Sequence, residues 1–282
     1  MSGSIAIITN EFNNKIEGTR YFVARLVRLW KHRGWDVHVT AGCNYIPADL
    51  AFLHVDTSVV ADEYLELGRR YPVAINGTVN SILKSSISHY LLKRDDSWPG
   101  PVIVKTDANY GGMNEFANAA NSGRQGWIDP AVQRPWRKRE VIHSLEYPVF
   151  NSISDVPTGV WKNHHLVVEK FLPERLENGD YRSRTYVFYG QQEFAAWMTA
   201  PVPVVKSTVA NEAGIIEDIP PSIRAIRQAS GFDYGKFDYT EVDGETIVFD
   251  MNKTPALGSL IVDMIPARKL REFGDEILSF RT

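Results

Sequence analysis

The chain has 282 residues, of which 44% are hydrophobic and 23% are charged, and its formal net charge is −3. This composition excludes a disordered chain, and the lack of a long basic run argues against a surface for nucleic acid. A single cysteine, Cys43, rules out a disulfide within the chain. Its neighbours offer no histidine or acid, so we predict a small buried or half-buried residue rather than a nucleophile.

The first 76 residues alternate short apolar runs with helical spacing, which predicts a small parallel sheet covered by helices. Strands are predicted at 4–9 (SIAIIT), 35–40 (WDVHVT), 49–55 (DLAFLHV) and 71–75 (YPVAI), and helices at 18–34 and 62–70. The stretch after the first strand reads TNEFNNKIEGT. It lacks the glycines of a dinucleotide-binding turn, so this sheet is not predicted to bind NAD.

From residue 77 onward the pattern favours strands and hairpins. We predict a helical connector at 77–93, then a strand at 102–106 (VIVKT) that runs into a flexible glycine-bearing loop at 107–113 (DANYGGM). Residues 114–150 resist assignment beyond helix plus loop. Further on we predict a strand at 166–171, a hairpin of 183–189 and 192–199, a helix at 221–231, and a last hairpin of 235–242 and 246–250.

The last hairpin carries a possible metal site. Asp250 and Asn252 are two apart on a strand, so their side chains point to the same face. Paired oxygen ligands suit a hard cation such as Mg²⁺, although a polar strand end followed by turn residues would give the same letters. Asp238 on the preceding strand is a third candidate ligand.

The turn decides whether this set can share one face. A two-residue turn at 243–244 would pair Asp238 with Phe249 and turn Asp250 away. A three-residue loop at 243–245 with a bulge would pair Asp238 with Asp250. We therefore predict the longer loop.

A magnesium site that is completed by phosphate oxygens also needs basic side chains that neutralise the phosphates. Lys105 lies among apolar residues in VIVKT. It is either a solvent-facing lysine on an edge strand or a lysine aimed at a nucleotide phosphate, with the glycine loop (Gly111 and Gly112) closing over it. Three further basic residues are candidates for the same phosphates: Lys84, Arg184 and Lys236. Each alone is more typical of a surface charge, but together they form a coherent set.

This order of segments resembles the ATP-grasp superfamily over most of residues 70–258, through PVIVKTDANYGG, LVVEKFLPE, RTYVFYG and KFDYTEVDGETIVFDMNKTP. The resemblance implies a mixed α/β and α+β fold. A small N-terminal parallel α/β domain (1–76) would precede a central ATP-grasp subdomain (77–172) and a C-terminal subdomain with the metal site (173–282). ATP would lie between the last two.

The resemblance also implies roles for individual residues. Lys84 and Lys105 would contact the phosphates of ATP, and the metal ligands would be Asp238, Asp250 and Asn252. The adenine would lie along the end of one strand: Glu169, Lys170, Phe171 and Leu172. Arg184 and Lys236 would neutralise charge during catalysis. The family usually has glutamate at position 250 and often has arginine at position 236, where lysine meets a phosphate without bidentate geometry.

The activity that the resemblance implies is an ATP- and Mg²⁺-dependent ligase, which activates a carboxylate as an acylphosphate for attack by an amine. Two alternatives use the same nucleotide site. One is a kinase that phosphorylates a small molecule or peptide, and the other is a non-catalytic ATP-binding regulator. The ligase would release ADP and phosphate, whereas the kinase would leave a phosphorylated product.

The substrates are poorly specified by the sequence. Lys206 and Asn211 (VVKSTVANEAG) are the leading candidates for substrate contact, ahead of Arg182 and the basic cluster at 134–139. We expect small-molecule or peptide carboxylate and amine substrates, no nucleic-acid or membrane partner, and a cytoplasmic protein without a signal peptide. His164 and His165 do not predict a zinc site, because neighbours on a strand point to opposite faces.

Overall fold

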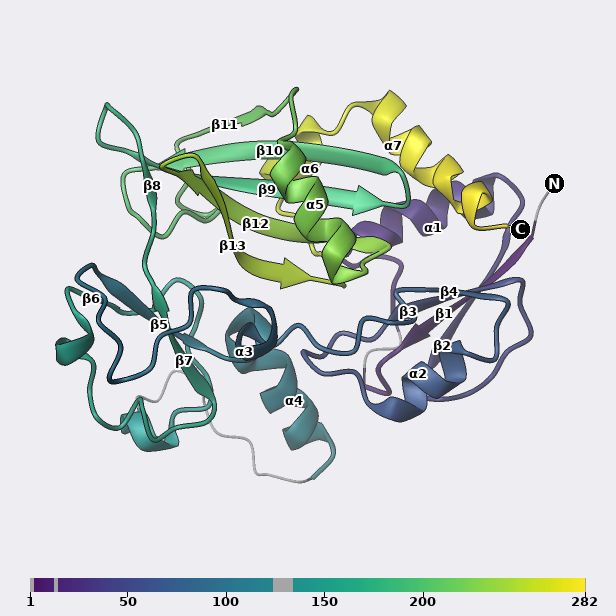
Figure 1. Ribbon diagram of the computed structural model, residues 1–282. Helices are drawn as coiled ribbons and strands as arrows, with labels where there is room; N and C mark the ends of the chain where they lie inside the picture. Colours follow the sequence, from purple (N-terminus) through teal and green to yellow (C-terminus); the bar gives the residue numbers. More distant parts are fainter. Residues whose placement is uncertain (1–2, 13–14, 124–133, 282) are drawn as a thin grey trace.

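The computed structural model describes residues 3–12, 15–123 and 134–281, and these residues form three sheets that lie side by side (Figure 1). One sheet is parallel and comes from the N-terminal segment. The other two contain antiparallel pairs and come from the middle and the C-terminal part of the chain. The mixed α/β and α+β class predicted from the sequence is confirmed.

The N-terminal sheet has the strand order β2-β1-β3-β4, with all neighbours parallel. Its predicted strands and helices are confirmed, with small changes in their ends: β1 (Ser4–Thr9), α1 (Phe22–His32), β2 (Asp36–Ala41), β3 (Leu50–His54), α2 (Asp62–Gly68) and β4 (Val73–Ile75). Strands β1 and β3 are buried almost throughout, as their continuous apolar runs require.

The central sheet places β5 (Val102–Thr106) between β6 (Val149–Phe150) and β7 (Leu166–Lys170). The predicted helix at 77–93 is wrong, because only α3 (Lys84–Ile87) is helical there. This segment is rich in serine and asparagine, which favour turns over helix interiors. Its backbone instead bridges to neighbouring segments, at Val59 with Ser81 and at Leu91 with Glu169.

The C-terminal sheet is antiparallel and has the order β11-β10-β9-β12-β13, with β8 paired to β9. Its elements are β8 (Glu174–Arg175), β9 (Tyr181–Tyr189), β10 (Gln192–Ala200), β11 (Glu212–Ile215), α5 (Pro221–Ser230), β12 (Tyr234–Val242) and β13 (Glu245–Asn252). The predicted hairpin around Gly190 and Gln191 is confirmed by the pairing of Tyr189 with Gln192.

Within 114–150, the segment that resisted assignment, the structure has most of α4 (Met113–Asn121), η2 (Trp136–Lys138) and β6, while residues 124–133 lie outside the described part of the chain. Two short helical turns flank this segment, η1 (Asn109–Gly112) and η3 (Ile153–Asp155). The end of the chain adds elements that the sequence analysis did not predict: α6 (Ser259–Met264), α7 (Ala267–Asp275) and η4 (Glu276–Phe280).

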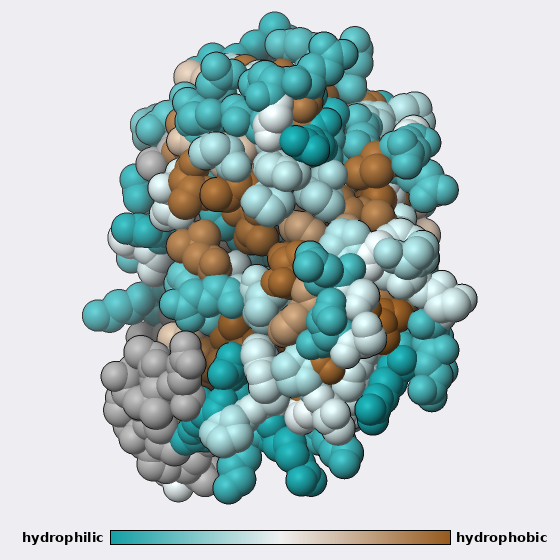
Figure 2. Space-filling model, turned by 90° about the vertical axis from the view of Figure 1, so that its left-hand side faces the viewer, coloured by the Kyte–Doolittle hydropathy of each residue, from teal (hydrophilic) through white to brown (hydrophobic). Residues whose placement is uncertain are grey.

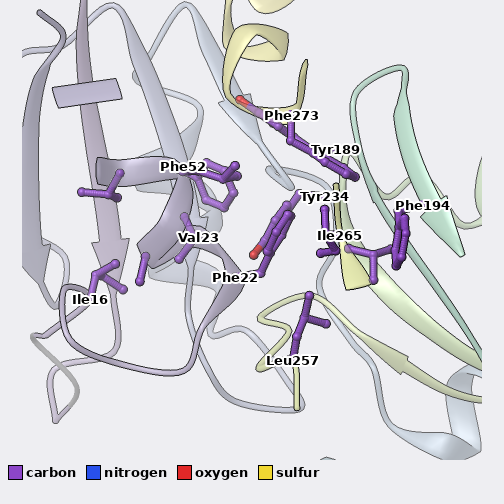
Figure 3. Packing of buried hydrophobic residues seen from close by; sticks show 14 of the residues in the cluster. Ile16, Phe22, Val23, Phe52, Tyr189, Phe194, Tyr234, Leu257, Ile265 and Phe273 are labelled. Atoms are coloured by element: carbon purple, nitrogen blue, oxygen red, sulfur yellow. The ribbon is translucent and has the colours of Figure 1, made fainter. Parts of the chain in front are cut away.

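Helix α7 packs on α1, and this contact joins the two ends of the chain. Trp30 Nε1 donates a hydrogen bond to Gly274 O at 3.0 Å, and the rings of Phe22 and Phe273 meet edge to face. Figure 3 shows the apolar cluster to which these phenylalanines belong, with Phe52 from the parallel sheet beside Tyr234 from the antiparallel one. The N-terminal sheet and the C-terminal sheet therefore share one core.

Two smaller predictions are corrected by the structure. Cys43 is exposed rather than buried or half-buried. His164 and His165 precede β7 instead of lying on a strand, and their ring centroids are 4.0 Å apart. Within the described residues, no group of three histidine, cysteine, aspartate or glutamate side chains could hold a metal ion, and no helix has the length and apolar character to cross a membrane.

Candidate nucleotide and metal site

A cavity of about 250 Å³ lies between the central and the C-terminal sheets. Its walls carry more positive than negative charge, which suits a polyphosphate. The charged residues that line it are Lys84, Lys105, Lys170, Arg182, Lys206 and Lys236 against Glu169, Asp238 and Asp250. Figure 2 shows the end of the molecule that carries β6 and β8 in Figure 1, and apolar side chains gather near the middle of this face between hydrophilic margins.

The hairpin of β12 and β13 does place Asp238 opposite Asp250, but not through the predicted loop. Val242 pairs with Glu245, so the turn has two residues. Both of them have positive φ, 52° at position 243 and 82° at position 244, as a type I′ turn requires. The prediction of a three-residue loop is therefore wrong.

A β-bulge inside β13 supplies the shift of register instead. Tyr239 pairs with Val248 and Asp238 pairs with Asp250, so Phe249 is the extra residue. Lys105 Nζ donates to Phe249 O at 3.5 Å, and the ammonium lies 5.4 Å from the centre of the Phe249 ring. The bulge thus forms where β13 meets the central sheet, which no local sequence signal reveals.

Asp238 is the most firmly held of the three candidate metal ligands. Thr185 Oγ1 donates to one of its carboxylate oxygens at 2.8 Å, and Lys236 Nζ donates to the other at 2.6 Å. Burial alone would raise the pKa of Asp238, but the ammonium groups of Lys236 and Lys206 lower it below its usual value. The carboxylate is therefore ionised and ready to accept a cation.

Lys84 and Lys105 are both buried and both line the cavity. Lys105 Nζ lies 2.6 Å from Glu169 Oε2, and β5 is the middle strand of its sheet, which excludes a solvent-facing lysine on an edge strand. Burial would raise the pKa of Glu169, but Lys105 holds it below its usual value. Lys84 Nζ lies 3.9 Å from Asp250 Oδ1, so this lysine is next to one of the candidate metal ligands.

The predicted adenine edge also lines the cavity, through Lys170, Phe171 and Leu172. At least three of its backbone groups are already used: Lys170 N–H donates to Tyr90 O and Phe171 N–H to Pro101 O, both at 2.9 Å, and Leu172 O accepts from Thr240 Oγ1 at 3.2 Å. Among the described residues, none accepts a hydrogen bond from Leu172 N–H. This group is the free backbone donor that the edge of a purine ring could use.

The structure does not bring Gly111 and Gly112 to the cavity. Both glycines are buried with positive φ, and a Cβ on Gly111 would lie 2.3 Å from Ile142 O. Because they have no side chain, the backbone of residues 140–142 can pack directly against the start of α4. The side chain beside them, Tyr110, belongs to the predicted loop at 107–113; it is 60% exposed and does line the cavity.

Arg184 and Asn211 also lie outside the cavity lining. Arg184 Nη2 is held by Glu174 Oε1 at 2.7 Å and Glu241 Oε2 at 2.9 Å. On β9, the residue in register with Asp238 is Thr185, and neighbours on a strand point to opposite faces. The side-chain amide of Asn211 is engaged by Thr199 and by Asp180. Thr185 was missed because the register between β9 and β12 cannot be read from sequence.

A second cavity, of about 120 Å³, adjoins the first one. Lys206, Lys236 and Asp238 line both cavities, so they form the boundary between them. The residues that line only the second cavity include the apolar Met198, Leu257 and Ile261 together with the hydroxyl-bearing Thr185 and Ser207. Burial lowers the pKa of Lys206, although Asp238 partly offsets this effect. No described carboxylate lies within 4.0 Å of the Lys206 ammonium.

The donor set of the site fits magnesium. Mg²⁺ prefers oxygen ligands, keeps part of its water shell and is held in nucleotide sites by one or two carboxylates together with phosphate oxygens. Asp238, Asp250 and Asn252 supply two carboxylates and an amide oxygen on one strand pair, all lining the cavity. They are too few to enclose the ion alone, so phosphate oxygens and water would complete its shell.

Comparison of the sequence with protein-family models and with curated proteins finds no match. The structure, in contrast, is similar along nearly its whole length to solved ligases. The D-alanine–D-alanine ligase of Bacillus anthracis complexed with ATP aligns over 99% of this chain and 97% of its own, with a TM-score of 0.53 and 11% identity. The ATP-grasp ligase PsnB, solved with a precursor variant, Mg and ADP, aligns over 100% of both chains, with a TM-score of 0.51 and 9% identity. D-cycloserine synthetase DcsG aligns over 99% of this chain and 100% of its own, with a TM-score of 0.50 and 12% identity.

Proposed function

The chain has the ATP-grasp fold, and from this premise we propose that it is an ATP- and Mg²⁺-dependent ligase that joins a carboxylate to an amine. The observation that carries the proposal is the convergence of three oxygen ligands with two buried lysines. Asp238, Asp250 and Asn252 come from one hairpin, Lys84 and Lys105 come from the central subdomain, and all five line one cavity. Such an arrangement can hold the metal and the phosphates of one nucleotide.

Each of these residues has a role in the proposed reaction. Magnesium-bound ATP supplies the γ-phosphoryl group that converts a carboxylate into an acylphosphate. Lys84 and Lys105 donate hydrogen bonds to phosphate oxygens, while Lys236 neutralises charge beside Asp238. Lys105 keeps its direction because Glu169 holds it at 2.6 Å. Preorganised charges of this kind need no reorganisation when charge moves in the transition state.

The reaction proceeds in two balanced steps. A carboxylate oxygen of the acid bonds to the γ-phosphorus while the bond to ADP breaks. The amine nitrogen then bonds to the carbonyl carbon, phosphate leaves with the oxygen, and the nitrogen loses a proton. A carboxylate is a poor acyl donor on its own, and phosphate is a much better leaving group.

We place the acid in the second cavity, with its carboxylate between Lys206 and Lys236. These lysines line both cavities together with Asp238, so a carboxylate there would lie next to a phosphate bound with the metal at Asp238. Lys206 is the better partner, since Lys236 is already paired with Asp238. The volume of about 120 Å³ favours a small acid, or one side chain of a peptide, over a bulky one, and Leu257 and Ile261 can contact its apolar part.

The experiment incubates the purified protein with ATP, Mg²⁺ and pooled small carboxylic acids and amines. ADP, phosphate and amide products are followed by mass spectrometry. We expect ADP and phosphate to form in equal amounts only when an acid is present. A phosphorylated product without free phosphate would establish a kinase, and no turnover with any pool would refute the ligase.

Matched variants test the site, with urea denaturation of each variant confirming that it is folded under the conditions of the binding assay. Lys105→Ala and Asp238→Asn should each weaken Mg-ADP binding at least tenfold. The controls are Lys93→Ala and Asp243→Asn, which change exposed residues of the same types. Asp243→Asn also suits the turn, because Asn-Gly is a preferred type I′ sequence. Intact Mg-ADP binding in both site variants would show that the nucleotide lies elsewhere.

A further inference from the structure

The loop that follows β3 connects the N-terminal sheet to the candidate metal site. Lys253 is 1% exposed, and its ammonium donates hydrogen bonds to Val55 O and to Thr57 O, the latter at 2.6 Å. A buried ammonium that bonds two carbonyls of one loop fixes the position of that loop. The residue between the two carbonyls is Asp56.

Asp56 accepts two short hydrogen bonds from other segments. Tyr21 Oη donates to its Oδ2 at 2.5 Å, and Thr254 Oγ1 donates to its Oδ1 at 2.5 Å. The carboxylate of an N-terminal residue is thus in direct contact with the segment that follows β13. Asn252, a candidate metal ligand, is two residues before this threonine.

Thr254 has a second acceptor within reach, namely Asn252 Oδ1. The Thr254 N–H donates to this oxygen at 2.8 Å, and Thr254 Oγ1 lies 3.2 Å from the same oxygen. A hydroxyl has one proton and donates it to one acceptor at a time. The bond to Asp56 is shorter and charge-assisted, so the proton points to Asp56. Asn252 Oδ1 then uses one lone pair for the backbone N–H and keeps the other.

We propose that Asp56 is a positioning residue for the metal site: by taking the hydroxyl proton of Thr254, it leaves the second lone pair of Asn252 Oδ1 free for the cation. This inference rests on the proposed function, in which Asn252 is a metal ligand. Without Asp56, the hydroxyl proton turns to Asn252 and competes with the metal. A loop of the N-terminal domain thereby controls how well Asn252, a residue of the C-terminal subdomain, can bind the metal.

The experiment measures Mn²⁺ binding in the presence of ADP, from the electron paramagnetic resonance signal of free Mn²⁺. Asp56→Ala should weaken Mn²⁺ binding about fivefold, the factor that one neutral hydrogen bond contributes. Thr254→Val removes the competing hydroxyl and keeps the N–H, so it should change the affinity less than twofold. In the Thr254→Val background, Asp56→Ala should have no further effect. Asp56→Asn keeps an acceptor for the hydroxyl and should bind Mn²⁺ like the wild type.

Three results would overturn the inference. The first is that Asp56→Ala lowers the Mn²⁺ affinity equally in the wild-type and in the Thr254→Val background. The second is that Asp56→Asn lowers the Mn²⁺ affinity as much as Asp56→Ala does. The third is that Thr254→Val binds Mn²⁺ as weakly as Asn252→Ala. Asp49→Ala is the matched control, because Asp49 accepts hydrogen bonds from Ser4 in the same sheet at 2.7 Å and 3.1 Å. Wild-type Mn²⁺ affinity in Asn252→Ala would refute the metal site itself, which is a separate failure. If Asp56→Ala does not fold, Thr254→Val and Asp56→Asn still decide the question.

Discussion

The ion pair between Lys105 and Glu169 offers a quantitative test of how the central sheet supports the site. Lys105 is 7% exposed and Glu169 is 2% exposed. At their separation of 2.6 Å and an effective dielectric constant of about 20, two unit charges attract each other by about 6 kcal/mol. Desolvation of both ions offsets most of this energy. The loss of one partner, however, leaves a buried charge without its nearest opposite charge.

We therefore expect Lys105→Met and Glu169→Leu each to lower the free energy of unfolding by about 3–5 kcal/mol. The double variant Lys105→Met/Glu169→Leu removes both charges of the pair. Its free energy of unfolding should therefore be within about 1 kcal/mol of that of the wild type, or higher. Urea denaturation at pH 7, followed by circular dichroism, measures all four proteins. The double variant should fold well but bind Mg-ADP weakly, because Lys105 also serves the phosphates.

The dependence on pH provides a second readout of the same pair. The pKa of Glu169 is lower in the folded protein than its ordinary value. Its contribution to stability is therefore present above the pKa of the unfolded chain and is lost as the pH falls through the folded value. Additive losses in the double variant, or single losses below about 1 kcal/mol, would refute the reasoning.

Three further predictions concern the hairpin, the N-terminal sheet and the glycine turn. Deletion of Phe249 should remove the bulge but leave Asp250 opposite Asp238, so Mg-ADP binding measured by calorimetry should be retained, whereas Asp250→Ala should weaken it at least tenfold. Loss of binding after the deletion would contradict the register argument. Burial lowers the pKa of His54 from 6.5 to about 4, so as the pH falls the unfolded chain becomes protonated at a higher pH than the folded protein. The free energy of unfolding should therefore fall by about 3 kcal/mol between pH 6.5 and pH 4. His54→Leu should flatten this part of the pH profile in urea denaturation, and an unchanged slope would contradict the assignment. Gly111→Ala should destabilise the fold by at least about 2 kcal/mol, because φ is +69° and Ile142 O blocks the methyl group. A drop in ATP affinity without a loss of stability would instead support a glycine loop that covers the nucleotide.

The local patterns of the sequence were sufficient for most elements of the three sheets. A strand of a parallel sheet is buried on both faces and therefore has apolar residues at consecutive positions. A hairpin strand that buries one face has them at alternate positions, so both patterns can be seen within one short segment of sequence. The same patterns ordered the candidate ligands Asp238, Asp250 and Asn252 along one hairpin. For Lys105 they left two alternatives open, and only the position of β5 in the middle of its sheet excluded a solvent-facing lysine on an edge strand.

Tertiary contacts decided the rest of the site. The bulge at Phe249 forms against the central sheet, and the register between β9 and β12 sets Thr185, rather than Arg184, beside Asp238. The contact between Asp56 and Thr254 spans 198 positions in sequence. Registers between strands and contacts between distant loops depend on which surfaces meet in the folded chain. A local window of sequence contains only one of the two partners, so it cannot specify such contacts.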